Sequence, residues 1–101
     1  MNYHLIISDK QKELTKAVKD AIGIGFQKGY LASHSLDYSM FEGSFSAEIK
    51  DKVKGEVIFD TGFMEMNPRA IYTLNFGKIC KELDENIKRV KEFISLVKNL
   101  K

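Results

Sequence analysis

The sequence has one cysteine, one proline, no tryptophan and no apolar run long enough to cross a membrane. Because Cys80 has no partner in the chain, the disulfide framework on which small secreted domains depend is excluded. The short apolar cluster near the N-terminus ends at Ser8 and follows no basic residue, so it indicates neither a signal peptide nor a transmembrane helix. We therefore expect a soluble protein of the reducing cytoplasm that binds no membrane.

Internal repeats, low-complexity tracts and linkers rich in glycine or serine are also missing. Hydrophobic residues make up 44% of the 101 residues and charged residues 30%, which suits a folded chain and not a disordered one. The net charge of +2 is too close to balance to indicate nucleic-acid binding by itself. A chain of this length predicts one domain, over residues 1–101.

Two helices are the clearest predicted elements. Ser8 has the character of an N-cap, since Asp9 follows it and Gln11 lies three residues on, and helical spacing continues to about Leu31. A second helix is predicted near the C-terminus from a continuous apolar stripe. The stripe consists of Ile79, Leu83, Ile87, Val90, Ile94 and Val97.

Strand composition occurs at residues 3–7, at residues 44–50, where apolar and polar residues alternate, and from residue 56 to residue 66, with a break near Thr61 and Gly62. Residues 32–43 show no clear period and are predicted to form a loop that partly packs.

The segment after Asn67 and Pro68 is ambiguous. Residues 71–76 have strand composition, but Asn67 also suits an N-cap with proline at the first helical position, which would extend the C-terminal helix backwards. We favour the strand. The predicted order is then β-α-β-β-β-α, a two-layer α+β fold in which an antiparallel sheet of about four strands packs against two helices.

A row of small residues runs along the first predicted helix beside a row of large ones. The small row is Ala17, Ala21, Gly25 and Gly29. A glycine inside a helix costs about 1 kcal/mol relative to alanine, so two in one row indicate close approach by another element, either of the same domain or of a partner. Alternatively, Gly23 and Gly25 end the helix early.

The C-terminal stripe indicates a second place for close packing or assembly. A helix of this length spans about 30 Å, which is more than a small sheet covers in most directions. Its end, at Ile94 and Val97, is covered either by the first helix or by a second copy of the chain in a homodimer.

Motifs that would indicate an enzyme or a cofactor are mostly missing. The glycines between residues 23 and 29 do not fit the dinucleotide fingerprint, and His4, His34 and Cys80 lack the spacings of zinc ligands, so we predict no cofactor and no metal. His34, in one predicted loop with Asp37, Tyr38 and Glu42, is the best candidate for acid-base chemistry, and a small enzyme centred on His34 is our second alternative. We assign no catalytic residue.

Charge is unevenly distributed along the chain. Residues 32–69 contain seven acidic and four basic residues, a sum of −3, whereas the predicted helices are basic. Lys12, Lys16 and Lys19 fall within about 60° of one another on the first helix, opposite its apolar rows. This stripe is either a solvated face or a docking surface for an anionic partner.

The leading functional hypothesis is a small non-catalytic binding module, such as an adaptor, inhibitor or accessory factor. It would act through a protein partner that docks on Lys12, Lys16 and Lys19. The first alternative is a nucleic-acid-binding protein that uses the same three lysines.

Overall fold

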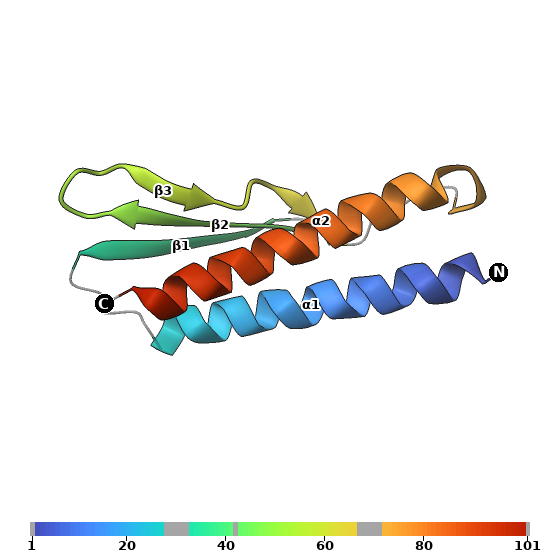
Figure 1. Cartoon of the computed structure of the whole chain (residues 1–101), viewed down its shortest axis with the longest axis horizontal. Helices are drawn as coiled ribbons and strands as arrows, with labels where there is room; N and C mark the ends of the chain where they lie inside the picture. Colours follow the sequence, from blue (N-terminus) through green and yellow to red (C-terminus); the bar gives the residue numbers. More distant parts are fainter. Residues whose placement is uncertain (1, 28–32, 42, 67–71, 101) are drawn as a thin grey trace.

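The computed structural model describes residues 2–27, 33–41, 43–66 and 72–100, and it has an α+β fold (Figure 1). Its elements, in chain order, are α1 (Tyr3–Gln27), β1 (His34–Phe41), β2 (Ser44–Asp51), β3 (Val57–Asp60), β4 (Met64–Glu65) and α2 (Tyr72–Asn99). The expected class, two helices with an antiparallel sheet of four strands, is confirmed, although the order begins with a helix and not with a strand.

The sheet is antiparallel, with β2 between β1 and β3, and β4 pairs with β2 beyond the end of β3. The hairpin between β2 and β3 is closed by Asp51, whose carboxylate accepts hydrogen bonds from the backbone N–H groups of Val53 and Lys54 at 2.8 and 3.2 Å. Gly55 follows with a φ of 72°, a conformation that favours glycine. The break predicted near Thr61 and Gly62 separates β3 from β4.

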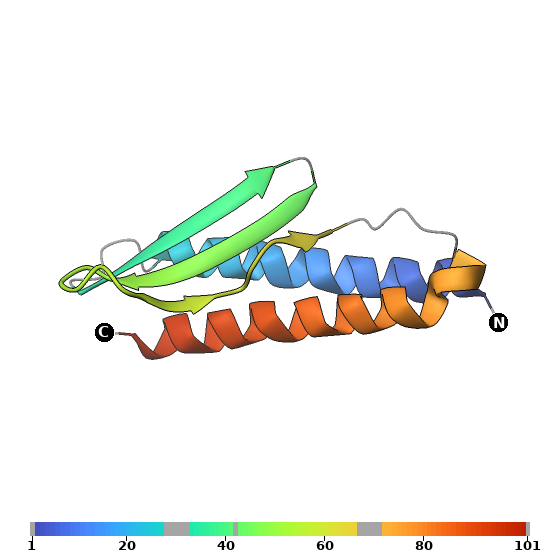
Figure 2. The same cartoon turned by 90° about the horizontal axis from the view of Figure 1, so that it is seen from above.

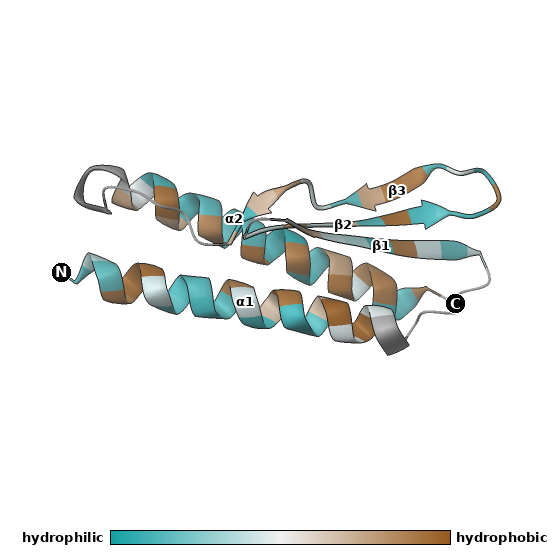
Figure 3. Ribbon diagram, turned by 180° about the vertical axis from the view of Figure 1, so that it is seen from behind, coloured by the Kyte–Doolittle hydropathy of each residue, from teal (hydrophilic) through white to brown (hydrophobic). Residues whose placement is uncertain are grey.

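The two helices run side by side in the same direction (Figures 1 and 2). Contacts between the helices occur in the same order along both. The ring of Tyr3 lies 4.7 Å from that of Phe76 between centroids, and further along both helices Lys10 pairs with Asp84. Apolar and polar segments alternate along both helices, as expected of helices that bury one face each (Figure 3).

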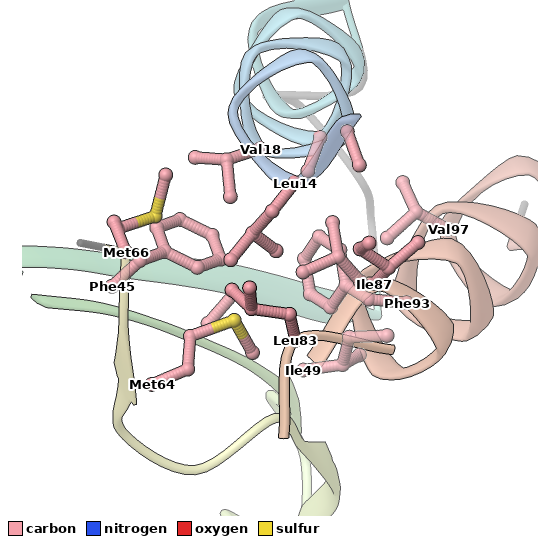
Figure 4. Packing of buried hydrophobic residues seen from close by; sticks show 14 of the residues in the cluster. Leu14, Val18, Phe45, Ile49, Met64, Met66, Leu83, Ile87, Phe93 and Val97 are labelled. Atoms are coloured by element: carbon pink, nitrogen blue, oxygen red, sulfur yellow. The ribbon is translucent and has the colours of Figure 1, made fainter. Parts of the chain in front are cut away.

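The core lies between α1, α2 and the inner face of the sheet (Figure 4). The alternation predicted for residues 44–50 is confirmed, because Phe45, Ala47 and Ile49 of β2 are buried. From α2, the fully buried side chains include Leu83, Val90, Phe93 and Val97. From α1, they include Ile7, Leu14 and Ala21.

The predicted strand at residues 3–7 is wrong, because these residues form the first turns of α1. The helix is capped by Asn2, whose side-chain oxygen accepts a hydrogen bond from the Leu5 N–H at 3.1 Å, so Ser8 is not the N-cap. Ile7 is buried in line with Leu14, seven residues on. A short apolar run cannot distinguish helix from strand by its own period, and the cap at Asn2 decides between them.

The predicted loop at residues 32–43 is also wrong, because residues 34–41 form β1. Leu36 and Tyr38 pack against the core while Asp37 and Ser39 face outward, so the period of two is present. The sequence itself carries this alternation, since polar Ser35, Asp37 and Ser39 alternate with Leu36 and Tyr38, so the prediction of a loop overlooked a visible signal.

The favoured strand at residues 71–76 is wrong as well, because residues 72–76 belong to α2, which begins at Tyr72. Phe76 packs against the core and against Tyr3, which extends the apolar stripe of α2 by one turn. Residues 67–71, which include the predicted N-cap Asn67 and Pro68, lie outside the described residues.

Candidate functional site

The three lysines proposed as docking residues are exposed on one side of α1. Lys12, Lys16 and Lys19 line a shallow hollow of about 450 Å³ together with polar residues of the same helix. These neighbours are Ser8, Gln11 and Thr15. The Thr15 hydroxyl donates to the Gln11 carbonyl at 2.9 Å, so it is already bonded to the helix. The stripe therefore presents ammonium groups as its main recognition feature.

Two lysines that face the opposite helix are engaged within the chain. Lys10 of α1 lies 2.7 Å from the Asp84 carboxylate, whose hydrogen bond raises the pKa of Lys10, and Lys91 of α2 lies 3.3 Å from the Glu13 carboxylate. Among the described residues, by contrast, the stripe lysines form no ion pair. Positive charge is thus neutralised between the helices and left open on the outer side of α1.

A second charged surface, which the sequence did not predict, lies on the outer face of the sheet. Asp37 of β1 is directly opposite Glu48 of β2, and Glu48 is directly opposite Asp60 of β3. We call these three residues the acidic row. They line a hollow of about 300 Å³ that also includes Gly62 and the ring of Phe63.

The members of the acidic row differ in their partners. Glu48 accepts a hydrogen bond from Lys50 at 3.2 Å, which raises the pKa of that lysine. Asp60 accepts a hydrogen bond from the Gly62 N–H at 2.8 Å. In the described part of the chain, neither Asp37 nor Asp60 has a cation as an ion-pair partner.

The sequence carried only an indirect signal for the acidic row. Residues 32–69 are acidic as a segment, but they join one surface only through the registers of β1 with β2 and of β2 with β3. No group of histidine, cysteine or acidic side chains within the described ranges is placed to hold a metal ion.

The structure separates His34 from Asp37, two of the residues named for acid-base chemistry, and Glu42 lies outside the described residues. His34 starts β1 and lies 2.9 Å from the Ser33 hydroxyl, whereas Asp37, three residues on, is on the opposite face of the strand. Tyr38 faces inward and donates to the Ala21 carbonyl at 2.9 Å, and burial raises its pKa to about 12. A phenol with that pKa holds its proton throughout the physiological range.

The structure describes three of the four residues predicted to pack closely or to form an assembly, and their surroundings differ. Gly25 is buried against the ring of Tyr38, so its close approach is to an element of the same chain. Val97 is fully buried in the core, and Ile94 is half-buried beside it. Gly29 lies outside the described residues.

Cys80 is a free, partly buried thiol that packs against the core. In the portion of the chain that the structure covers, neither helix has the length and apolar composition needed to cross a membrane. Comparison of the chain with protein-family models, with curated proteins and with solved structures finds no match.

Proposed function

We propose that this protein is a non-catalytic binding module that acts through a protein partner, and that the partner docks on Lys12, Lys16 and Lys19. The observation that carries the proposal is the contrast between these lysines and those that face the other helix. Lys10 and Lys91 are neutralised by carboxylates within the chain, whereas the stripe keeps three exposed ammonium groups about 10 Å from end to end. Such an arrangement favours an anionic surface as its complement.

The residues around the stripe favour a protein over a nucleic acid. Asp9 and Asp20 are both exposed on α1 and border the three lysines, whereas Glu13 is paired with Lys91 of α2. Carboxylates in these positions repel a continuous phosphate backbone, whereas a protein surface can offer separate acidic and neutral groups to match them. The stripe is also short compared with the six to ten phosphate contacts of a typical duplex-binding protein.

The experiment compares the wild type with a variant that carries Lys12→Glu, Lys16→Glu and Lys19→Glu. Each protein is immobilised and exposed to lysate of its native cell, and retained protein and nucleic acid are both analysed. We expect the wild type to retain a protein that the variant does not. A matched control reverses three other exposed lysines, Lys54, Lys78 and Lys81, and should retain the partner.

Two results would contradict the proposal. One is equal retention of every partner by the wild type and the stripe variant at low salt. The other is retention of nucleic acid by the wild type, with an affinity for a labelled duplex that falls steeply with salt, because this is the signature of phosphate binding.

A further inference from the structure

We infer that the partner of the lysine stripe is a second copy of this chain, which presents its acidic row. The inference rests on the proposed function, because it names the partner of the same three lysines. It requires Lys12, Lys16 and Lys19 of one copy to lie over Asp37, Glu48 and Asp60 of another.

The two surfaces match in number and in spacing. Seven residues of α-helix separate Lys12 from Lys19, a rise of about 10 Å. Two steps between neighbouring strands, each about 4.8 Å, separate Asp37 from Asp60, a span of about 10 Å. A helix that crosses the strands therefore places one ammonium group over each carboxylate.

The acidic row has an energetic reason to accept cations. Like charges on directly opposed strand positions destabilise a sheet, and the row contains two such pairs, Asp37 with Glu48 and Glu48 with Asp60. Lys50 offsets this repulsion only in part, since it bonds Glu48 and acts on Asp37 only through a weaker Coulombic attraction. Cations of another copy would neutralise Asp37 and Asp60, the two ends of the row.

Apolar side chains beside each surface favour one orientation of the docked helix. Phe63 is 71% exposed in the hollow of the acidic row, and Ile58 on β3 is 52% exposed. On α1, Leu5 is 57% exposed and precedes Lys12 by about two turns, on the same side of the helix. If Lys12 of one copy lies over Asp60 of the other, Leu5 of the first copy points to the β3 side of the second copy's sheet, where these apolar groups lie. Exposed aromatic and aliphatic groups of this kind supply much of the affinity of interfaces.

The contact is heterologous, because the stripe and the row are different surfaces of the molecule. The stripe is on the exposed side of α1, and the acidic row is on the sheet face turned away from the core. Each copy can thus engage one neighbour through its stripe and another through its row. Such contacts build rings or open chains of subunits.

The test measures the weight-average mass of the purified full-length chain by light scattering, at high micromolar concentration and at about 0.02 M and 0.5 M salt. We expect at least a twofold rise in mass at low salt and a return toward the monomer at high salt. The stripe variant, Lys12→Glu with Lys16→Glu and Lys19→Glu, should remain a monomer at both. The control with Lys54→Glu, Lys78→Glu and Lys81→Glu should associate like the wild type.

A charge exchange identifies the complementary surface. A row variant with Asp37→Lys, Glu48→Lys and Asp60→Lys should also be a monomer. Mixing it with the stripe variant should restore association, because the stripe and the row of each variant then both meet an opposite charge on the other. If the charge-reversed row variant does not fold, a neutral row variant is used in its place, with Asp37→Asn, Glu48→Gln and Asp60→Asn. It should lose association while its circular dichroism stays native.

Three results would overturn the inference: a monomeric wild type at low salt, association that survives in the neutral row variant, or no restoration on mixing two folded variants. None of them contradicts the proposed function, which fails if the stripe variant retains every partner of the wild type from the lysate or if the wild type retains nucleic acid with an affinity that falls steeply with salt. If the wild type is a monomer and retains a foreign protein that the stripe variant does not, the proposed function is supported and the partner is not a second copy of the chain.

Discussion

The backbone of Gly25 in α1 lies directly against the ring of Tyr38 in β1, at a point where a Cβ atom would overlap the tyrosine hydroxyl and the adjoining ring carbons. The same hydroxyl donates to the carbonyl of Ala21, one turn earlier on the helix. The other side of the ring meets Phe93 of α2 edge-on, at 5.7 Å between centroids. Tyr38 therefore joins both helices to the sheet, and it fits only because residue 25 has no side chain.

Gly25→Ala is expected to destabilise the fold by about 1–3 kcal/mol, and the larger Gly25→Leu by more, because the ring of Tyr38 must move away from α1. The measurement is denaturant unfolding followed by circular dichroism. Gly23→Ala is the matched control: it is on the same helix with nothing within 4 Å, so it should stabilise the protein by about 0.5–1 kcal/mol. Similar effects of the two substitutions would show that Tyr38 does not constrain residue 25.

The raised pKa of Tyr38 predicts a loss of stability at alkaline pH. The unfolded tyrosine ionises near pH 10 and the folded one near pH 12, so the unfolded state binds fewer protons between these values and stability falls as the pH rises through this window. Because the ring is only partly buried, the contribution is reduced by solvent to about 1–2 kcal/mol.

Tyr38→Phe separates this effect from the titration of other groups. The variant should be less stable than the wild type at neutral pH, since the bond to Ala21 is lost, and the difference should shrink between pH 10 and pH 12. Denaturant unfolding over that range measures it. Parallel stability curves for the two proteins would show that the phenol of Tyr38 ionises equally in both states.

The class of the fold and most of its core could be predicted from the sequence, since they depend on periods that repeat several times along one element. The α2 stripe and the alternation of β2 are of this kind. The errors fell on short segments whose neighbours decide their state. Residues 3–7 are helical because Asn2 caps them and Ile7 reaches the core, and Tyr72 starts α2, which Phe76 anchors on Tyr3.

The two charged surfaces of the candidate site also differ in how far the sequence could predict them. The lysine stripe lies on one helix, where spacing in the sequence fixes spacing on the surface, so Lys12, Lys16 and Lys19 could be grouped from the sequence. The acidic row comes from three strands, and its members become neighbours only through strand register. A register that depends on the bulge between Ile49 and Lys50 is not visible in the spacing of residues along the chain.

Thr61 is a buried polar residue whose side chain replaces a backbone bond of the sheet. Its hydroxyl oxygen accepts from the Ala47 N–H at 2.9 Å, and its own N–H donates to the Ala47 carbonyl at 2.9 Å. Thr61→Val should cost about 1–3 kcal/mol, because it leaves the Ala47 N–H buried and unpaired. Thr61→Ser keeps the acceptor and should cost less. Hydrogen exchange at the Ala47 amide checks the assignment: unchanged protection in Thr61→Val would contradict it.

Asp37→Asn should raise the free energy of unfolding by about 0.2–1 kcal/mol, since it removes one of the two like-charge pairs of the acidic row. Glu65→Gln is the control, because Glu65 is also exposed on the sheet but lies opposite the uncharged Ser44. It should have a smaller effect. The gain for Asp37→Asn should also decrease as salt is added, since screening weakens the repulsion. A loss of stability in Asp37→Asn would indicate that Lys50 already neutralises the row.

The end of α2 provides a separate test of a homodimer formed through that helix. Val97 is fully buried within the chain, so Val97→Glu should place an unpaired carboxylate in the core and cost about 3–5 kcal/mol, seen as a loss of native circular dichroism. The effect of that substitution on oligomeric state would therefore not report on a dimer.

Leu96 is the better probe, because it is 40% exposed next to the buried residue, and Leu96→Glu should leave the monomer folded. If α2 forms the contact, Leu96→Glu should abolish association at every salt concentration, since an apolar interface does not depend on screening. If the stripe and the row form it, Leu96→Glu should associate like the wild type and dissociate only when salt is added.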